Sequence, residues 1–484
     1  MGVAALLVSG AACRKAPPER KLEVLVPFLP ANLDPFADSR LVARSLFTAI
    51  YEPLVEETAL GIRPAIAESW TNPSPNSWVF RIAATASFHD GTLVTSDDVL
   101  AAVRTSRAAV STFVGLADLK EAEAPDARTV RFTTHTAARD FLLAVSALYI
   151  VRPAGGTFMG TGRYRVVART PELITLRRHP RPNRPLPFFD EVRFRRMQGP
   201  LADLRLLREG RDLAVLEPTR AMVDEIRDDL RYQVMTTQSG GLTYLAIGFA
   251  AGPGPLGDVR VRRSLRLAID LPELARAGTI AGGTPAGQLV PPGTFGFDPV
   301  RTAPHRDVVE ARRLLAAAGL PNGFDAALDV NPHGRQAAEA LARQAAEAGI
   351  RLHVTVHSPD EFVARIQGKS PLYLYSWYVG EDAGHSLRSA FHTKDPVRVL
   401  GTLNRTGFSN PAIDRIFVTL AATTRAEERQ RLLREVLGLL DTELPWIPLF
   451  SARQVRILPA GLGLPQRADG LFVVTEARPA GRGR

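Results

Sequence analysis

The sequence contains a single cysteine, Cys13, in 484 residues. One cysteine excludes an internal disulfide and any zinc site built on several cysteine ligands. No apolar run reaches the roughly 20 residues that a membrane-spanning helix needs. A G-x-S-x-G segment is also missing, so the chain shows no nucleophilic serine of the serine-hydrolase kind. These absences weigh against nucleophilic catalysis and against cysteine-bound metal.

Lysine is nearly as scarce as cysteine. The net charge is +10, and only five of the 60 basic residues are lysines: Lys15, Lys21, Lys120, Lys369 and Lys394. The arginines are scattered along the chain and mixed with acids, whereas a nucleic-acid binder usually concentrates its basic charge on one face. We therefore expect an arginine-rich, solvated surface and no nucleic-acid partner.

The remaining composition is that of a globular protein. Hydrophobic residues make up 45% of the chain and charged residues 23%, without a long low-complexity tract. A chain of 484 residues has room for two or three lobes of ordinary size.

Two glycine-containing segments superficially match nucleotide-binding motifs. Gly252–Gly257 reads G-x-G-x-x-G, but a phosphate cradle needs backbone N–H donors, and Pro253 and Pro255 have none. Gly368–Ser370 matches the end of a Walker A loop, yet Val363 occupies the position of its first glycine. We expect a connection between lobes at the first segment and no bound nucleotide or other cofactor.

Histidines offer two further candidates for chemistry. His353 and His357 have the i, i+4 spacing of a metal site, but they fall in a predicted strand, where four residues span about 13 Å. They therefore cannot share one ion directly, and we expect no metal. His89 beside Asp90 suggests an acid–base pair, although a purely structural turn explains the two residues as well.

The N-terminus changes character at Cys13. Residues 1–12 are apolar and small, and Arg14–Lys21 is polar and proline-rich. This pattern resembles a bacterial lipoprotein signal, in which the cysteine carries the lipid, although no basic segment precedes the apolar run. The alternative is an incidental cysteine at a cytoplasmic terminus.

A strand, a turn and a capped helix are predicted between Trp78 and Val99. Trp78–Ile82 alternates as a half-buried strand does, and Asp90-Gly91 favours a tight turn. Thr95 and Ser96 offer hydroxyl caps, and acids follow in the first turn of the helix, where the helix dipole favours them.

Similar start signals predict helices further along the chain. Asp258 caps a helix with one apolar face, and Asp307 opens another that ends at Gly319. Thr424 to Glu427 reads as a capping box for a long helix that extends to Leu440.

Several short motifs in a consistent order carry a resemblance to a known family: Leu33-Asp34-Pro35, Tyr51–Leu54, Pro64–Trp70, Phe88–Gly91, Thr95–Val99, Gly160–Tyr164, Asp258–Asp270, Ala318–Phe324, Phe408–Asp414 and Pro445–Phe450. On these segments the chain resembles the extracytoplasmic solute-binding proteins of ABC importers, family 5, whose members bind oligopeptides, dipeptides or nickel complexes. The resemblance runs from about Leu33 to Phe450.

The resemblance implies an α/β, two-lobed periplasmic-binding-protein fold of type II, of the large peptide-binding class with an extra inserted subdomain. The expected division is a signal and linker at 1–21, an inserted subdomain (lobe II) at 46–160 and lobe III at 251–445. Lobe I would combine 22–45, 161–250 and 446–478.

The implied function is capture without chemistry. The protein would hold di- or oligopeptides between its lobes and deliver them to ABC permease subunits, as a monomer in the periplasm or cell envelope, lipid-anchored through Cys13. A nickel complex, an opine or a sugar on the same scaffold is the alternative ligand. An envelope hydrolase is a further alternative, but no catalytic residue is visible for it.

The resemblance also implies a ligand site after the predicted buried strand 372–377. In peptide-binding relatives a tryptophan followed shortly by an aspartate lies here, and the aspartate pairs with the α-amino group of the peptide. Trp377, Glu381 and Asp382 are the matching residues, and Asp382 is the preferred anchor. Gly248 stands where the family often has a ligand-contacting asparagine, so we include it as a candidate.

Overall fold

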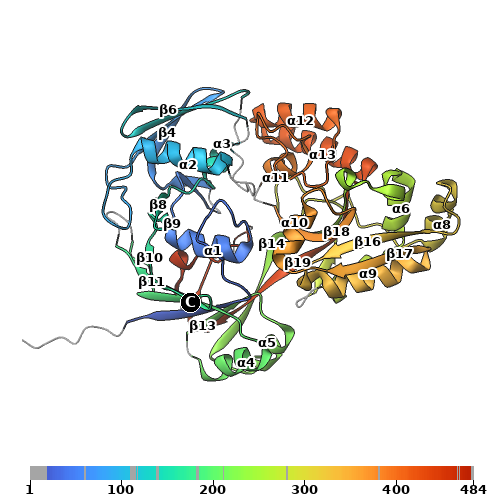
Figure 1. Cartoon of the computed structure of the whole chain (residues 1–484), viewed down its shortest axis with the longest axis horizontal. Helices are drawn as coiled ribbons and strands as arrows, with labels where there is room; N and C mark the ends of the chain where they lie inside the picture. Colours follow the sequence, from blue (N-terminus) through green and yellow to red (C-terminus); the bar gives the residue numbers. More distant parts are fainter. Residues whose placement is uncertain are drawn as a thin grey trace, which may run out of the picture.

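The structure is a computed structural model that describes residues 19–58, 61–108, 116, 118–137, 141–180, 185–210, 212–278, 282–379, 382–465, 467 and 469–480. It is a mixed α/β protein with two lobes, which confirms the predicted fold class (Figure 1). Two long antiparallel strands, β14 (Tyr232–Ile247) and β19 (Trp446–Pro459), run from one lobe into the other. Among the described helices, none has both the length and the apolar character needed to span a bilayer.

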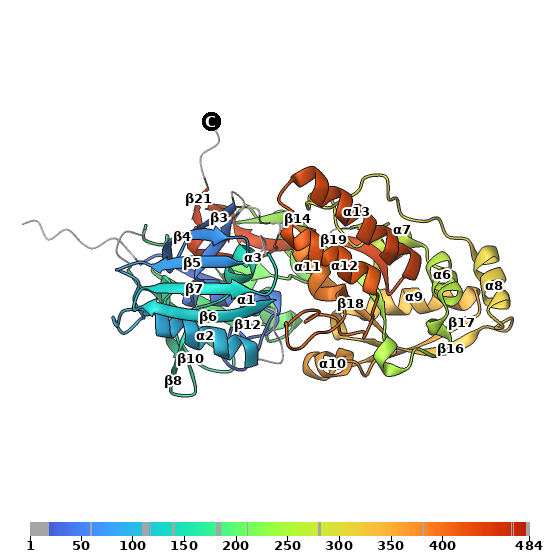
Figure 2. The same ribbon diagram turned by 90° about the horizontal axis from the view of Figure 1, so that it is seen from above.

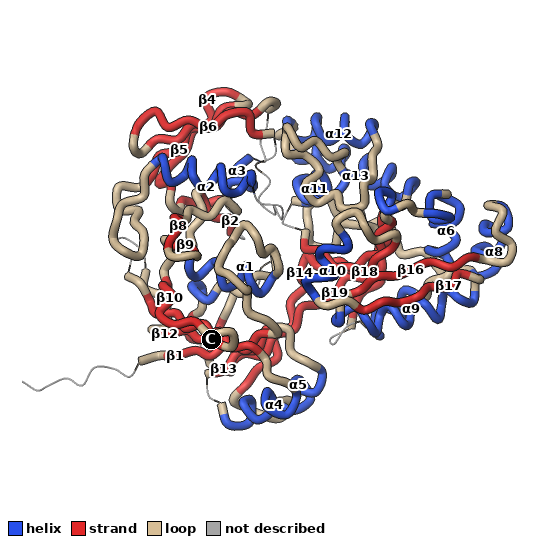
Figure 3. The backbone as a smooth tube through the Cα atoms, viewed as in Figure 1, coloured by secondary structure: helices blue, strands red, loops and turns tan. Residues whose placement is uncertain are grey.

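One sheet extends through both lobes, with β14 and β19 at its centre (Figure 3). From the first lobe to the second, the other strands of this sheet are β10 (Tyr164–Arg169), β11 (Leu173–Arg178), β12 (Glu191–Arg196), β1 (Lys21–Val26), β13 (Leu213–Leu216), β18 (Leu372–Tyr378), β16 (Phe324–Val330) and β17 (Ile350–Val356), with β15 (Gly283–Pro285) paired to β19. Strand β1 is parallel to β12 and β13, and β16 is parallel to β17.

In the first lobe, helices and side chains pack against both faces of this sheet. Along β1, Val24 belongs to a large core, whereas Leu25 points to the opposite face, as the two-residue period of a strand requires. The large core receives α1 (Leu41–Ile50), and the opposite face is covered by α4 (Pro200–Glu209) and α5 (Arg220–Glu225). The chain ends against this lobe with β20 (Leu462–Gly463), η4 (Val474–Glu476) and β21 (Arg478–Pro479).

A separate antiparallel sheet forms part of the first lobe, with its strands in the order β4-β5-β7-β6 (Figure 2). The elements of this region are β2 (Val55–Thr58), β3 (Gly61–Pro64), β4 (Ala67–Ser74), β5 (Ser77–Ile82), α2 (Ser96–Ala108), β6 (Leu119–Asp126), β7 (Thr129–Thr134), α3 (Phe141–Val145), β8 (Arg152–Ala154) and β9 (Thr157–Met159). Phe80 of β5 shares a core with Val24 of β1. The expected boundaries of the inserted subdomain at 46 and 160 stay a prediction.

The second lobe is a sheet between two layers of helices. One core contains η2 (Gly254–Gly257), α6 (Val259–Leu267), α7 (Leu271–Ala277), α8 (Val308–Ala317) and α9 (Arg335–Glu347). The core on the other face contains α10 (Pro359–Ile366), α11 (Ala383–Phe391), α12 (Pro411–Ala422) and α13 (Ala426–Glu443). Two further short turns are η1 (Phe249–Ala251) and η3 (Pro332–Gly334).

The strands that join the lobes are interrupted where the lobes meet. The register of β14 against β19 shifts between Gln238 and Leu242, opposite Ser451 to Arg453. Extra residues in one strand of a pair bend that strand locally. The interruption contains two consecutive glycines, Gly240 and Gly241, which tolerate a wide range of backbone angles. This part of the chain therefore bends locally as it passes from one lobe to the other.

Most of the predicted local elements are confirmed. Strand β5 and helix α2 flank a turn with Gly91 at φ 88°. Asp258 caps α6, and Asp307 caps α8 by accepting from the Glu310 N–H. The capping box predicted at Thr424 is wrong, because α13 begins one residue later than expected, after Arg425, and has no side-chain cap.

His353, in β17, and His357, directly after it, contact different carboxylates. His353 Nε2 lies 2.9 Å from Asp325, which is exposed. His357 Nε2 lies 2.7 Å from Asp329, which is 1% exposed at the end of β16.

Asp329 is the centre of a buried hydrogen-bonded cluster. Its Oδ2 accepts from Ser370 Oγ at 2.6 Å and from Arg365 Nε at 3.0 Å, in addition to the His357 contact at Oδ1. Burial alone raises the pKa of Asp329, but the hydrogen bonds from Ser370, His357 and Arg365 lower it overall. The cluster ties β16 to α10 and to the start of β18.

Because the folded-state pKa of Asp329 lies below the unfolded value of about 3.9, its contribution to stability is present above that value. This contribution is lost as pH falls through the lower, folded value. We expect Asp329→Asn to lower the free energy of unfolding at pH 7 by about 3 kcal/mol. The gap between wild type and variant should narrow as pH falls from about 5 through the unfolded value of about 3.9. Urea unfolding across this range measures it, and a gap independent of pH would contradict the assignment.

Candidate functional site

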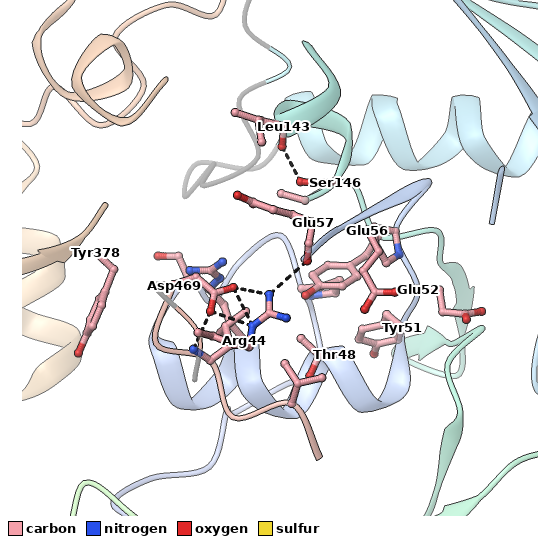
Figure 4. A pocket seen from close by; sticks show the side chains of 18 of the residues that line it. Arg44, Thr48, Tyr51, Glu52, Glu56, Glu57, Leu143, Ser146, Tyr378 and Asp469 are labelled. Atoms are coloured by element: carbon pink, nitrogen blue, oxygen red, sulfur yellow. Dashed lines mark hydrogen bonds and ion pairs between the residues drawn. The ribbon is translucent and has the colours of Figure 1, made fainter. Parts of the chain in front are cut away.

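A cavity of about 270 Å³ lies between the two lobes. The first lobe contributes residues from α1, from the β2–β3 hairpin, from the end of α3 and from the C-terminal segment 467–478. The second lobe contributes the end of β18, the start of α11 and Leu403. Figure 4 shows Glu52, Glu56 and Asp469 on one side of this space and Tyr378 on the other.

The wall of the first lobe is built on ion pairs. Arg467 Nη2 lies 2.7 Å from Asp469, and Arg467 Nη1 lies 3.5 Å from Glu476. The same guanidinium donates to the backbone carbonyl of Glu57 at 3.2 Å, which fastens the C-terminal segment to the β2–β3 hairpin. Burial alone raises the pKa of Asp469, but Arg467 lowers it overall, so the carboxylate stays ionised. This wall therefore presents fixed charges of both signs.

The hairpin adds a second pair to the same wall. Arg63 Nη2 lies 2.9 Å from Glu56 and 3.9 Å from Glu476. The hydrogen bond with Glu56 raises the pKa of Arg63. Tyr51 lies beside these groups, and its hydroxyl donates to the Leu33 carbonyl at 2.6 Å, so the ring is held in one orientation.

The wall of the second lobe is aromatic. Trp377 is 8% exposed, and its ring meets that of Trp446 edge-on, with centroids 5.2 Å apart. Within the described residues, its Nε1 atom is buried without a hydrogen-bond partner. Tyr378 also lines the cavity, and burial raises the pKa of its hydroxyl. An unpartnered buried donor is costly in a protein interior.

Asp382 also lines the cavity, and two protein groups already hold its carboxylate. Oδ2 lies 2.6 Å from Arg429 Nη2, and Oδ1 accepts from the Gly384 N–H at 2.7 Å as the N-cap of α11. Arg429 is 7% exposed and also donates to the carbonyls of Leu420 and Thr423. Sequence reasoning missed this arginine because it lies on another helix, 47 residues away.

Gly248 is not among the described residues that line the cavity. It follows β14 and packs against the chain before β18, where a Cβ at position 248 would lie 1.9 Å from the Ser370 carbonyl oxygen. Trp377 and Asp382 are thus brought together at one cavity, and Gly248 is placed elsewhere. Glu381 and Cys13 lie outside the described residues.

Most of the first-lobe wall was not predicted from the sequence. Tyr51–Pro53 was interpreted only as a family motif, yet all three residues line the cavity. The C-terminal segment 467–478 gave no motif at all. Its charged residues become a wall only because the segment returns to the first lobe after β19.

The cavity suits a small polar molecule with charged ends and some apolar surface. Within the described part of the chain, no group of three or more His, Cys, Asp or Glu side chains is arranged to hold a metal ion.

The family "Bacterial extracellular solute-binding proteins, family 5 Middle" matches residues 61–397. Among individual proteins, the glutathione-binding protein GsiB of Escherichia coli K12 is 23% identical over 453 residues, which are 88% of this chain and 87% of that protein. Heme-binding protein A of Haemophilus influenzae is 24% identical over 268 residues, and this match spans 46% of that relative.

Solved structures of similar fold cover nearly the whole chain. The binding protein AgaA of A. tumefacien R10, in complex with agropinic acid, superposes with a TM-score of 0.85 at 20% identity, over 96% of this chain and 99% of that one. DppA of Helicobacter pylori, in complex with the peptide STSA, gives a TM-score of 0.84 at 18% identity, over 95% and 98%. At this identity the likeness concerns the fold.

Proposed function

Because the chain belongs to the bacterial extracellular solute-binding proteins of family 5, the substrate-binding components of ABC importers, we propose that its cargo is a short peptide held between the two lobes. Proteins of this family are transport binding proteins and not enzymes, and they work outside the cytoplasm with ABC permeases. An envelope hydrolase is therefore excluded.

The observation that carries the proposal is the cavity itself. At about 270 Å³ it is slightly smaller than usual ligand pockets, which measure roughly 300–1,000 Å³. A di- or tripeptide suits this volume better than a long oligopeptide. A peptide of this size carries an ammonium and a carboxylate, and the wall at Arg467, Asp469 and Glu476 offers charges of both signs. Its amide groups can use polar groups of the walls whatever its side chains are.

The roles of individual residues belong to this proposal. Trp377 would contact the ligand through its indole, and Asp382 would accept from the ligand amine. A carboxylate has about four lone-pair sites, so the bonds from Arg429 and Gly384 leave capacity for one more donor. Glu381 remains a candidate ligand-binding residue beside Asp382. Gly248 also remains a candidate, although it is not among the described residues that line the cavity.

The proposal also includes the division of the chain into lobes I to III, a monomeric protein and a lipid attached to Cys13. The relatives support a peptide cargo through the names "glutathione-binding" and "in complex with peptide STSA". An opine is the second candidate ligand, because AgaA was solved with agropinic acid.

Calorimetry with a dipeptide and its N-acetyl derivative tests the amine role. We expect Asp382→Asn to weaken binding of the free-amine dipeptide by about 1–3 kcal/mol, with little change for the N-acetyl form. Asp325→Asn is the matched control, because Asp325 pairs with Arg351 on the exposed surface of the same lobe. Equal losses for both ligands would exclude Asp382 as the amine anchor.

Mass spectrometry of material that co-purifies with the native protein tests the cargo class. We expect short peptides in the bound fraction, recovered chemically unchanged after incubation. An opine in their place would move the proposal to the second candidate, and hydrolysed products would contradict a binding function.

A further inference from the structure

The two lobes are in contact at a second place, away from the β14–β19 connection. Asp118, just before β6 in the first lobe, meets Arg398 in the loop between α11 and α12 of the second lobe. Figure 1 shows β6 and α12 on opposite sides of the gap between the lobes, with β14 and β19 at its other end. Neither Asp118 nor Arg398 is among the described residues that line the cavity.

The contact between Asp118 and Arg398 has two hydrogen bonds and a further close ion-pair contact. Arg398 Nε donates to Asp118 Oδ1 at 2.8 Å, and Arg398 Nη2 lies 2.6 Å from the same oxygen. In the main chain, the Asp118 N–H donates to the Arg398 carbonyl at 2.6 Å. Charge-assisted bonds of this kind are the strong ones in proteins, and the main-chain bond fixes how the two loops meet.

Each side of the contact is held in place by its own lobe. On the first lobe, Asp118 Oδ2 accepts from the Thr136 N–H at 2.8 Å and from the Thr136 hydroxyl. On the second lobe, Asp395 Oδ1 accepts from the Arg398 N–H at 3.0 Å. Asp118 and Val399 adopt left-handed backbone angles, with φ of 64° and 56°. Such conformations are costly for residues other than glycine and persist when the surroundings require them.

A second ion pair between the lobes provides a comparison. Arg40 of the first lobe lies 3.8 Å from Asp360 of α10, and the Asp360 side chain is 95% exposed. An exposed pair at this distance contributes little. The Asp118 side chain is 1% exposed and that of Arg398 30%, so water screens their interaction much less.

We propose that Asp118 and Arg398 form an interlobe latch that sets how long the closed form persists, and thereby how long a bound solute stays. The bonds join opposite lobes, so they exist only while the lobes are together. A contact made in one conformation shifts the equilibrium toward that conformation by its own free energy. The latch acts on closure itself, so it does not depend on the proposed peptide cargo.

Single-molecule fluorescence transfer on the full chain without ligand tests the latch. The dyes are placed at Leu93→Cys and Val418→Cys, two exposed positions on opposite lobes, in a chain that also carries Cys13→Ser. We expect Arg398→Gln to shorten the dwell time of the closed, high-transfer state about tenfold. Asp360→Asn, at the exposed pair, should leave the dwell time unchanged.

A second variant separates the latch from general damage to the loops. Exchanging the two charges in Asp118→Arg/Arg398→Asp should recover part of the dwell time lost in Arg398→Gln, and thermal unfolding should confirm that each variant is folded. Equal dwell times in wild type and Arg398→Gln would overturn the proposal. A wild-type chain that never enters the high-transfer state would overturn it too, because the latch would then not hold the lobes by itself.

Discussion

Gly248→Ala is expected to lower the free energy of unfolding by about 3 kcal/mol. The new Cβ would lie 1.9 Å from the Ser370 carbonyl oxygen and 3.2 Å from the Cα of Pro371. Both neighbours are backbone atoms of the segment that enters β18, so no side-chain rotation relieves the clash. The backbone angle at Gly248, φ −86°, is one that alanine adopts freely, and the expected loss is therefore steric.

The surroundings of Ser370 make the clash harder to relieve. Its hydroxyl is bonded to Asp329 at 2.6 Å, and the Gly248 N–H donates to the Pro371 carbonyl at 2.9 Å. A shift of this segment would break both bonds.

Gly257→Ala is the matched control for Gly248→Ala. Its added Cβ would meet only Pro253 Cγ, at 3.5 Å, which is ordinary contact. Denaturant unfolding of both variants, with ligand titration of the folded fraction, distinguishes the possible roles. A stable Gly248→Ala protein that fails to bind would restore the ligand-contact interpretation of this position.

Arg429→Met should have a comparable effect, with a loss of about 3 kcal/mol. The substitution leaves the Asp382 carboxylate, 24% exposed in its side chain, without the cation that lies 2.6 Å from it. A partly buried charge that loses its partner keeps the cost of desolvation without the compensating attraction. The carbonyls of Leu420 and Thr423 lose a donor as well.

Asp382→Asn should be milder, at about 1–2 kcal/mol, because asparagine is as good an N-cap as aspartate and Arg429 keeps its carbonyl acceptors. In the double variant Arg429→Met/Asp382→Asn, part of the unfolding free energy lost in Arg429→Met should be recovered, because the unpaired carboxylate is gone. A double-mutant cycle by urea unfolding measures this interaction. A coupling free energy near zero would show that the pair does not stabilise α11 against α13.

Local features of the fold were predictable because their causes lie within a few residues. The alternation of Trp78–Ile82 sets one face of β5 against the core, and Asp258 and Asp307 cap helices whose first N–H groups lie two and three residues away. The capping box at Thr424 failed for a local reason of the same kind, since α13 begins after Arg425.

The candidate site was predictable only where one short segment supplies it. Trp377 and Asp382 lie on either side of one strand-to-helix connection, so a family motif could locate both. Arg429 reaches Asp382 from another helix, and Arg467 and Asp469 reach the cavity from beyond β19. Those contacts depend on how distant elements pack, and no local pattern encodes them.

By itself, the sequence determined the family, the α/β two-lobed class and the strand that contains Trp377 and precedes Asp382. Periodicity, caps and ordered motifs are short-range properties, so they can be read along the chain. Only the tertiary structure decided which charges line the first-lobe wall of the cavity, that Gly248 packs beside Ser370, and that Asp118 meets Arg398 across the lobes. These pairings arise because β14 and β19 cross between the lobes, which brings residues together that are up to several hundred positions apart.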